Sequence, residues 1–590
     1  MRIRGDIILH FWLPVAGLWL FAANSAQKLV RVHLGTDVDS VNYIFTRQLP
    51  AHRGTIYDVT GSDCPLAKSI PVWEYHLDPV SMTNRVVRRP HEPPRPPKAI
   101  VRTIAKSLGL EYSKVLEMSM NSKKRYQFLA VSSDPDVHRT LTDSTLVAGI
   151  AVDERQVRQY PHGRMLSHVL GAVNSEHTGS AGIELRYDSV MKGLPGEIKG
   201  LKDAKGHELY DRRQVSVDPV AGADVYLTVD HNLQYEAERK LAAGVKEFGA
   251  GSGWCIVMDA RTGAVMAMAS LPDCNPSAFG SASESAKLNR AVAFTFEPGS
   301  VMKVITVASA IDAGFVRPDT VYRTNRDDPA YYRLPGDGHH AWDPTMTVRN
   351  AIVKSSNIVV GKLGYDFQPK RLYAHFRKFG LGERTGIELP GEECGILPDP
   401  NRKMWDKASW SRAAIGQFVA ITGIQLASAY QAIANDGMRM KPYIVDRVVA
   451  SDGKVLFRNV PTPAGRAVSA KTARTMRDIM LGVATRDGTA RRAAVRGYSV
   501  AGKTGTAEKH VPGIKGYAPG LYRASFCGIV PAGDPRLVVL VTLDFDERRP
   551  FHQGGNSAGP VFRDITTTAL RYLAIPPDRP EELEDEDDGA

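Results

Sequence analysis

The sequence predicts an α+β protein in which an antiparallel sheet is flanked by helices, after a mixed domain and an N-terminal membrane helix. Strand-like runs lie near both ends of the region 220–575, and helix-like stretches lie between them. This order favours a sheet whose first and last strands meet, with helices packed on it. The 590 residues are 43% hydrophobic and 24% charged. Such a composition indicates a globular protein of several domains and excludes disorder for the bulk of the chain.

The N-terminus has the features of a membrane anchor. Residues 7–23 are uncharged and largely apolar, which is close to the shortest run that crosses a bilayer. Arg2 and Arg4 precede this run, so residues 1–6 are expected in the cytoplasm and the remaining chain outside it. One alternative is a cleaved signal peptide, which would export the chain as well. The other is a buried helix of a soluble protein. Residues 24–48 are expected to form a linker.

Composition changes along the rest of the chain. Residues 49–219 are mixed and contain a basic, proline-rich stretch at 85–98, which indicates an extended loop. Residues 220–575 carry the regular strand and helix patterns. The tail at 576–590 holds eight acids and one arginine, and so polar a segment is expected to be disordered. The formal net charge is +11, so the basic body suits an anionic partner such as nucleic acid, phospholipid or acidic cell wall.

The patterns in the region 220–575 are specific enough to place elements. Strands are predicted where apolar residues alternate or form short runs bounded by turns, at 223–229, 254–258, 265–269, 524–530 and 537–543. Helical spacing follows the first strand at 233–241, and an amphipathic helix is predicted at 560–573. The sheet is therefore assembled from both ends of this region.

Metal and cofactor signals are weak. The five cysteines have no CxxC spacing, so neither a zinc ribbon nor a dense disulfide scaffold is predicted, and Cys255 and Cys527 are expected to be buried in strands. Residues 337–343 hold two His and two Asp, but a polar, glycine-rich loop explains them as well as a zinc site does. His510 is interpreted as a solvated loop residue. We expect no metal, no nucleotide and no other cofactor.

A serine and a lysine share the start of a predicted buried helix. Ser300 begins the segment 300–314, which is apolar on nearly every face and ends at a glycine. Lys303 follows three residues later on the same face, so its amine can approach the Ser300 hydroxyl. Burial and the positive end of the helix dipole would both lower the pKa of this lysine and favour its neutral form. The pair therefore predicts a nucleophile and its base.

Two further motifs make this pair significant, because a Ser-x-x-Lys alone arises readily by chance. Ser355 and Asn357 form a Ser-x-Asn motif on a helix-like segment, and Lys503 begins a Lys-Thr-Gly motif after a strand-like run. The three motifs stand in the order typical of penicillin-interacting acyl-transfer enzymes.

With these motifs, the chain resembles a class B penicillin-binding protein, and within that family the division-specific peptidoglycan transpeptidases. The likeness covers roughly residues 49–575 and includes several further segments: 257–263, 289–290, 296–300, 53–58, 158–161 and 179–184. It implies a five-stranded antiparallel sheet in the transpeptidase domain (220–575) and a pedestal domain at 49–219. The segment 58–67 departs from the family pattern, because it lacks an arginine and is about two residues longer, which puts the contacts of the pedestal there in doubt.

The resemblance implies a role for each motif residue. Ser300 is expected to attack the penultimate D-alanine carbonyl of a stem peptide, form an acyl-enzyme and release the terminal D-alanine. Lys303 is expected to accept the Ser300 proton, and Ser355 to pass it to the leaving amine. Asn357 is expected to hold the peptide group of the substrate, while Lys503 favours the neutral form of Lys303. An amine of a neighbouring stem peptide would then close the cross-link.

The strand at 503–506 is expected to bind the substrate as an added strand. The hydroxyls of Thr504 and Thr506, on either side of Gly505, would receive the substrate carboxylate. The backbone N–H groups of Ser300 and Thr506 would form the oxyanion hole. β-Lactams are expected to acylate the same serine.

The resemblance also implies a setting and leaves alternatives open. It implies a single-pass protein of the bacterial inner membrane with its catalytic domain on the periplasmic side, partnered by a SEDS-family glycosyltransferase and other division proteins, and not by nucleic acid. The alternatives are an elongation-specific transpeptidase, a membrane β-lactam sensor and an inactive division scaffold. The short segment 1–6 disfavours a sensor, and the intact motifs disfavour a scaffold. Hydrolytic relatives need a placed water, which the sequence does not indicate.

Overall fold

The computed structural model describes residues 44–584 apart from 62–63, 80–81, 83–97, 121–126, 143–148, 203–207, 210–214, 338–342, 402–404, 512, 515 and 548–552. The expected stub (1–6), membrane anchor (7–23) and most of the expected linker lie outside the described residues, as does the proline-rich stretch except for its last residue. Within the part that is described, no helix is long and apolar enough to cross a membrane.

The described chain forms two compact units, the smaller made of residues up to His52 together with Gly193–Ala221. It is an antiparallel sheet of four strands: β1 (Ile44–Leu49), β8 (Gly196–Lys202), β9 (Glu208–Leu209) and β10 (Val215–Val217). Strand β1 pairs with β8 from Ile44 opposite Leu201 to Leu49 opposite Gly196. The expectation of a linker up to residue 48 is therefore wrong for 44–48. Most side chains of β1 are exposed, so the partner strand and not an apolar pattern defines this element.

The larger unit combines residues Arg53–Lys192 with the chain from Gly222 onward. A seven-stranded mixed sheet joins them, in the order β18-β17-β11-β2-β3-β4 with β5 paired to β3. Its strands are β2 (Ile56–Tyr57), β3 (Pro65–Leu77), β4 (Gln127–Ser132), β5 (Ile150–Gln159), β11 (Asp224–Leu227), β17 (Val445–Val449) and β18 (Val455–Arg458). Because β2 runs parallel to β11, most of the expected pedestal domain shares one compact unit with the region that follows residue 220. The sequence-based boundary at 219/220 does not separate compact units.

Three sequence segments meet in a buried ionic cluster beside this sheet. Glu184, fully buried at the start of α7 (Gly182–Arg186), accepts hydrogen bonds from Arg53 Nε at 2.7 Å and Arg158 Nε at 2.6 Å. Arg53 also contacts Asp188 at 2.6 Å. Because buried charges are costly unless they are paired, the cluster fixes residues 53, 158 and 184 relative to one another.

Helices α3 (Lys98–Ser107), α4 (Tyr112–Met120) and α5 (Pro135–Thr142) form a second, smaller core with β3 and β4. The larger unit also contains several short helices and strands between these elements. They are α6 (Ser167–Leu170), β6 (Ala172–Val173), β7 (Gly179–Ala181), α8 (Asp188–Met191), η2 (Pro276–Ser281), α10 (Glu284–Lys287), α11 (Arg290–Ala293), β14 (Val321–Arg323), β15 (Thr345–Thr347), β16 (Met438–Met440), β19 (Pro463–Arg466), η4 (Gly482–Ala484) and η5 (Arg491–Ala493).

The main sheet has five antiparallel strands in the order β13-β12-β22-β21-β20, as the sequence predicts. They are β12 (Ser252–Asp259), β13 (Val265–Leu271), β20 (Ala501–His510), β21 (Tyr517–Val530) and β22 (Leu537–Asp544). Strand β12 pairs with β22 along its whole length, so the first and last strand pairs of the region do meet. Cys255 and Cys527 are buried in strands as expected. Strand β20 is left at one edge of the sheet.

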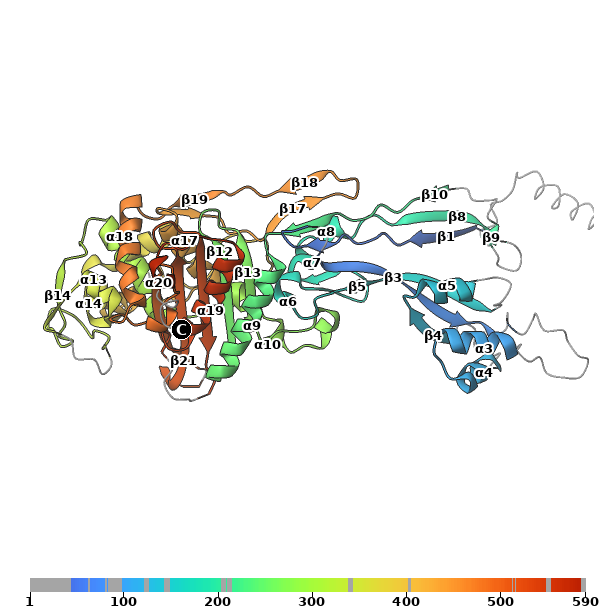
Figure 1. The fold of residues 1–590 in the computed structure, drawn as a ribbon, viewed down its shortest axis with the longest axis horizontal. Coiled ribbons are helices and arrows are strands. Elements are labelled where there is room, and N and C mark those ends of the chain that lie inside the picture. Colours follow the sequence, from blue (N-terminus) through green and yellow to red (C-terminus); the bar gives the residue numbers. More distant parts are fainter. Residues whose placement is uncertain are drawn as a thin grey trace, which may run out of the picture. The chain divides into compact units, whose positions relative to one another are not determined.

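Helices cover both faces of the main sheet. Helices α9 (His231–Phe248) and α19 (Ala558–Tyr572) lie side by side on one face (Figure 1). On β12, Gly253 faces Val245 of α9, whereas the next residue, Trp254, faces Gly423 of α17 (Gly423–Ala434) on the opposite face. Every residue of α17 is buried. Beyond α17 lie the other helices of the core: α12 (Lys303–Asp312), α13 (Val348–Val353), α14 (Asn357–Phe367), α15 (Pro369–Lys378), α16 (Lys407–Ala414) and α18 (Ala470–Leu481).

The acidic tail is ordered further than the sequence predicts. Asp578 accepts hydrogen bonds from the backbone N–H and the hydroxyl of Ser499, and Glu582 accepts one from Gly497 N. Residues Glu581–Glu584 form helix α20. The expectation of disorder from 576 onward is therefore wrong for 576–584, because these acids satisfy backbone donors and do not need to join an apolar core. Residues 585–590 lie outside the described part.

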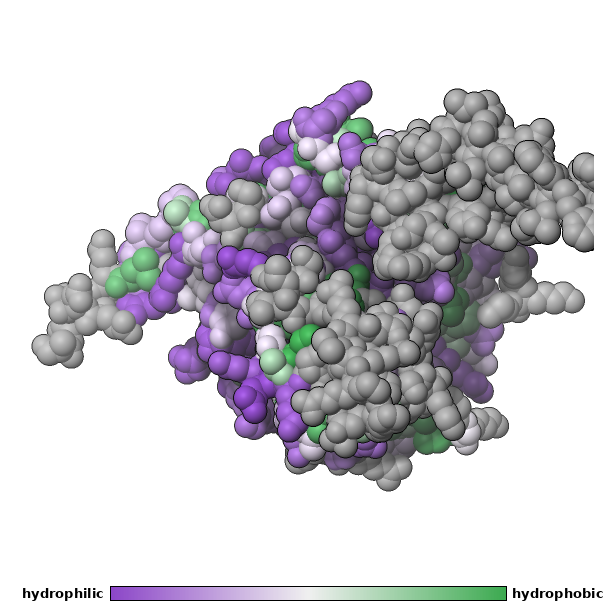
Figure 2. Space-filling view, turned by 90° about the vertical axis from the view of Figure 1, so that its right-hand side faces the viewer, coloured by the Kyte–Doolittle hydropathy of each residue, from purple (hydrophilic) through white to green (hydrophobic). Residues whose placement is uncertain are grey.

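The surface of the described chain is mainly hydrophilic on the face drawn in Figure 2, where hydrophobic residues form small, separate patches. Scattered apolar residues of this kind are normal for a surface in contact with water.

Candidate active site

Ser300 lies on a tight turn that leads into a buried helix. The turn is η3 (Gly299–Met302), and α12 begins at Lys303. Gly299 adopts a φ of 59°, and the buried hydroxyl of Tyr430 donates to the carbonyl of Val301 at 2.8 Å. These contacts hold the turn while Ser300 itself is half-buried and lines a cleft. The predicted buried helix is confirmed, with its first turn in 3₁₀ form.

Lys303 is fully buried beneath the cleft, and its amine contacts the second motif. Its Nζ donates to the carbonyl of Ser355 at 2.6 Å and to Asn357 Oδ1 at 2.7 Å, and lies 3.3 Å from Ser355 Oγ. Among the hydrogen bonds of the described residues, the Lys303 amine makes none to the Ser300 hydroxyl. The structure therefore brings the first two motifs together through Lys303.

Ser355 and Asn357 are presented by the turn between α13 and α14. Ser355 has a φ of 59°, a left-handed conformation that is uncommon for a residue with a side chain and is often found at functional sites. In this conformation the Ser355 carbonyl faces Lys303, and the Ser355 hydroxyl faces both Lys303 and Lys503. Asn357 donates from Nδ2 to the carbonyl of Gly336 at 2.7 Å. Both ends of the Asn357 amide are thus occupied within the protein in this structure.

The third motif reaches the same point from the sheet. Lys503 is fully buried on β20, and its Nζ donates to Ser355 Oγ at 2.8 Å and to Thr504 Oγ1 at 3.1 Å. Thr504 and Thr506 line the cleft, and Thr506 Oγ1 accepts a hydrogen bond from Gly554 N at 3.1 Å. Because β20 is an edge strand, it pairs only with β21 in the described sheet. An extended peptide can add to such an edge.

Gly505 allows this strand to lie against the turn of the nucleophile. A Cβ atom at position 505 would lie 3.0 Å from the carbonyl oxygen of Pro298 and 3.1 Å from a methyl group of Val301. The absence of a side chain therefore sets the close approach of β20 to η3, and Gly505 acts here through packing.

Burial changes the protonation of both lysines. Burial lowers the pKa of Lys303 to about 7, and the nearby Asp337 carboxylate opposes part of this shift. Burial also lowers the pKa of Lys503 well below its usual value, and the charge of Lys303 lowers it further. Two ammonium groups that share the Ser355 hydroxyl disfavour each other, so both lysines are not fully charged at neutral pH. The expected lowering of the Lys303 pKa by burial is confirmed.

Asp337 is a site residue that the sequence did not identify as one. Its carboxylate accepts hydrogen bonds from the Ser356 hydroxyl at 2.7 Å, from Ile358 N at 3.1 Å and from the backbone N–H of Asn357. It therefore holds the first turn of α14, where negative charge is favoured. In the sequence, Asp337 belongs only to the weak metal pattern at 337–343, of which residues 338–342 lie outside the described residues. The local sequence at 335–338, Pro-Gly-Asp-Gly, does not indicate that Asp337 caps a helix.

The cleft has a volume of about 1510 Å³ and brings together residues from all three motifs. Ser300, Ser355, Asn357, Thr504 and Thr506 line it, whereas Lys303 and Lys503 are buried beneath it. Gly505, in β20 between the two threonines, packs against η3. His510 lies away from these residues, exposed at the end of β20 with its ring against Tyr517. A serine hydroxyl above two amines of lowered pKa, beside a free sheet edge, is suited to acyl transfer from an extended peptide.

Comparisons with known proteins agree with this geometry. The model of the penicillin binding protein transpeptidase domain matches residues 253–567, and that of the penicillin-binding protein dimerisation domain matches residues 48–227. Penicillin-binding protein PbpB of Mycolicibacterium smegmatis is 34% identical over 482 residues, which cover 79% of this chain and 72% of that protein. Peptidoglycan D,D-transpeptidase FtsI of Escherichia coli K12 is 30% identical over 545 residues, which cover 90% of this chain and 85% of that protein.

A solved structure is similar over nearly the same extent. Penicillin binding protein 3 of Mycobacterium tuberculosis, in complex with aztreonam, superposes with a TM-score of 0.66 at 28% identity and covers 90% of this chain and 99% of that chain.

The fold, the cleft and these matches define a penicillin-binding protein with a transpeptidase domain. The chain belongs to the class B penicillin-binding proteins. The family and the enzyme class that the three motifs predict are thereby confirmed.

Proposed function

We propose that this chain is a peptidoglycan D,D-transpeptidase of cell division that cross-links stem peptides through an acyl-enzyme on Ser300. The observation that carries the proposal is the hydrogen bonding of Lys303 and Lys503 to Ser355 beneath a cleft that Ser300 and the edge of β20 line. The names of its relatives, which include peptidoglycan D,D-transpeptidases, support the substrate class.

The acylation step begins with the Ser300 hydroxyl. Its oxygen attacks the carbonyl of the penultimate D-alanine, and its proton passes to Lys303, whose pKa of about 7 leaves a substantial neutral fraction at neutral pH. In this structure the Lys303 amine donates to Ser355 and Asn357, so we expect its contact with Ser300 to form when substrate binds. Ser355, which both amines contact, then passes the proton to the leaving D-alanine.

Substrate binding involves the edge of β20 and the asparagine of the second motif. The Thr504 and Thr506 hydroxyls receive the terminal carboxylate, close to the positive charge that remains on the lysine pair. The backbone N–H groups of Ser300 and Thr506 stabilise the oxyanion. Asn357 contacts the peptide group of the donor, which requires it to exchange at least one of its present partners. An amine of a second stem peptide resolves the acyl-enzyme, and β-lactams acylate the same serine.

The setting is part of the proposal. The apolar run 7–23 anchors the chain in the inner membrane with the described units on the periplasmic side, and a SEDS-family glycosyltransferase and other division proteins are its partners. The likeness to FtsI supports division over elongation. Depletion of the protein should block septation and produce filaments, and Ser300→Ala should not rescue them. Rounded cells would indicate an elongation enzyme instead.

The reaction itself is tested with the full chain in detergent. A donor peptide ending in D-alanyl-D-alanine and a labelled D-amino acid acceptor should give released D-alanine and labelled peptide in the wild-type protein only. Release of D-alanine without labelled peptide would indicate a carboxypeptidase. No release by protein that still binds penicillin would favour a sensor or an inactive scaffold.

A further inference from the structure

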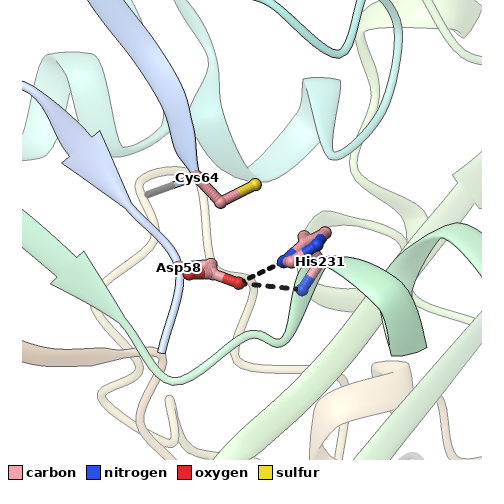
Figure 3. Close-up of side chains that lie close together, drawn as sticks. All are labelled: Asp58, Cys64 and His231. Atoms are coloured by element: carbon pink, nitrogen blue, oxygen red, sulfur yellow. Dashed lines mark hydrogen bonds and ion pairs between the residues drawn. The ribbon is translucent and has the colours of Figure 1, made fainter. Parts of the chain in front are cut away.

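A cluster of side chains of the types that bind metals lies outside the motifs of the active site. Asp58, Cys64 and His231 place a carboxylate oxygen, a sulfur and a ring nitrogen within 4.8 Å of one another. Figure 3 shows the three side chains converging from two segments, the connection between β2 and β3 and the first residue of α9. A fourth donor is adjacent, because Nε2 of His162 lies 3.3 Å from the Cys64 sulfur.

The backbone around these residues is well fixed. One carboxylate oxygen of Asp58 accepts hydrogen bonds from Thr60 and from Gly61 N, which closes the turn after β2. The other oxygen lies 2.5 Å from His231 Nδ1. His231 in turn follows Asp230, whose side chain caps α9. The contacts of Asp58 with Thr60 and Gly61 and the cap at Asp230 would remain when a metal ion binds, whereas the ion would replace the direct Asp58–His231 contact.

Hydrogen bonding alone explains only part of this cluster. Asp58 and His231 form a hydrogen-bonded pair, but this pair does not involve the thiol of Cys64 or the imidazole of His162. His162 is exposed, but its ring stacks on that of His231 and its Nε2 lies 3.3 Å from the Cys64 sulfur. The thiol and both imidazoles therefore lie together.

We propose that Asp58, Cys64, His162 and His231 bind one Zn²⁺ ion. A thiolate with two imidazoles selects zinc over magnesium or calcium, and four protein ligands make a closed, structural site. Tetrahedral zinc places a sulfur and a nitrogen ligand about 3.6 Å apart, and the Cys64–His162 distance of 3.3 Å is close to this. The Asp58–His231 distance must open from 2.5 Å. On binding, the Cys64 thiol releases its proton to solvent and both imidazoles bind as neutral ligands.

The ion would join three parts of the chain that are distant in sequence: Asp58 and Cys64 between β2 and β3, the turn that contains His162, and the start of α9. All three belong to the larger compact unit, and α9 packs on the main sheet. The site would therefore stabilise the junction between the N-terminal part of this unit and the catalytic sheet. Cys64 lies in the segment that departs from the family pattern, so membership of the family does not account for the cluster.

Metal titration of the full chain in detergent tests the proposal. After removal of metals with a chelator, the wild-type protein should bind about one Zn²⁺ per chain in competition with a chromogenic chelator, and its melting temperature should rise with Zn²⁺ but not with Mg²⁺. With Co²⁺ as the probe, it should show the near-ultraviolet charge-transfer band of a thiolate–cobalt bond.

Matched variants assign the ligands. Cys64→Ser should lose the charge-transfer band, whereas Cys394→Ser, which removes an exposed free thiol elsewhere, should keep it. Loss of a residue that only hydrogen-bonds to a metal ligand weakens metal affinity by about 10–100-fold. His231→Gln, which removes a ligand itself, should weaken Zn²⁺ binding by more than this. The circular-dichroism spectrum of each variant reports whether the protein is folded.

The proposal is overturned if the wild-type protein retains no zinc, if Cys64→Ser binds as tightly as Cys394→Ser, or if cobalt binds without the thiolate band. Should Cys64→Ser fail to fold, the wild-type titration and its thermal shift still decide the question. None of these readouts depends on the proposed transpeptidase activity, so the two proposals fail separately.

Discussion

The amines of Lys303 and Lys503 meet at one acceptor, the Ser355 hydroxyl, at 3.3 Å and 2.8 Å. Lys303 comes from the helix of the nucleophile and Lys503 from the edge of the main sheet, so Ser355 links the two layers that form the cleft. A hydroxyl that accepts hydrogen bonds from two buried amines is well placed to carry a proton between them and a substrate. The chemistry of the site thus depends on how these amines share their protons.

The pH dependence of acylation should follow the lysine pair. Below a pH of about 7 the Lys303 amine is protonated and cannot accept the Ser300 proton, so the second-order rate constant for acylation by a β-lactam should rise with pH through this range. Measurement from pH 5 to 9 in a buffer of constant ionic strength tests this. A flat profile for a protein that stays folded would contradict the role of Lys303 as the base.

Asp337→Asn should shift that profile to lower pH. The Asp337 carboxylate raises the pKa of Lys303 against the effect of burial, so its neutralisation should lower the pH at which acylation reaches half its maximum. The free energy of unfolding should also fall, by about 1–3 kcal/mol, because the amide accepts fewer of the hydrogen bonds at the start of α14. A midpoint that is unchanged or moves to higher pH would be inconsistent with this electrostatic coupling.

Ser355→Ala should separate binding from chemistry. Loss of the shared hydroxyl removes the proton relay, so acylation should slow by about 10²–10⁴-fold, while the affinity of the initial non-covalent complex should change little. Stopped-flow measurement of acylation against β-lactam concentration gives both quantities. An effect confined to affinity would assign Ser355 to substrate binding.

Gly505→Ala should disturb the cleft through packing. The added Cβ atom would press on the Pro298 carbonyl and on Val301, so the strand must move away from the nucleophile, and the free energy of unfolding should fall by about 1–3 kcal/mol together with the acylation rate. Gly280→Ala is the control, since nothing lies within 4 Å of its Cβ position. Equal behaviour of the two variants would rule out a close approach of β20 to η3.

The buried ionic cluster should dominate the stability of the N-terminal part of the larger unit. Glu184→Gln removes the buried carboxylate that pairs with Arg53 and Arg158. The loss should lower the free energy of unfolding by about 3–5 kcal/mol, because two buried guanidinium groups then lack this partner. Glu236→Gln breaks the pair with the exposed Arg239 and should cost less than about 1 kcal/mol. Denaturant unfolding of both variants provides the comparison, and similar losses would contradict the structure of the cluster.

Sequence motifs identify the residues that we propose as catalytic but not the residues that position them. Ser300, Ser355 and Lys503 were recognisable because the chemistry requires these residue types in a fixed order. Asp337 was not, because an aspartate in a loop can cap a helix that lies 20 residues later only once the fold brings them together. Gly505 likewise has a packing role that no local pattern indicates.

The elements of the fold likewise fall into those that local sequence patterns predict and those that depend on distant partners. Strong local patterns predicted the main sheet and its flanking helices, as at Trp254 and Leu540, which are fully buried. Strand β1 has mostly exposed side chains, and Asp578 is held by the backbone N–H and the hydroxyl of Ser499, which is distant in sequence. Such elements depend on tertiary partners, so residues 44–48 and 576–584 were predicted wrongly.

Intact mass spectrometry over time with benzylpenicillin, on the full chain and on Ser300→Ala, tests the acyl-enzyme most directly. The wild-type protein should gain one long-lived penicillin adduct, which peptide mapping places on Ser300, and the variant should gain none while remaining folded. An adduct that persists in Ser300→Ala, or a folded wild-type protein that forms no adduct, would contradict the assignment of Ser300. An adduct that clears within seconds would contradict transpeptidation in favour of hydrolysis.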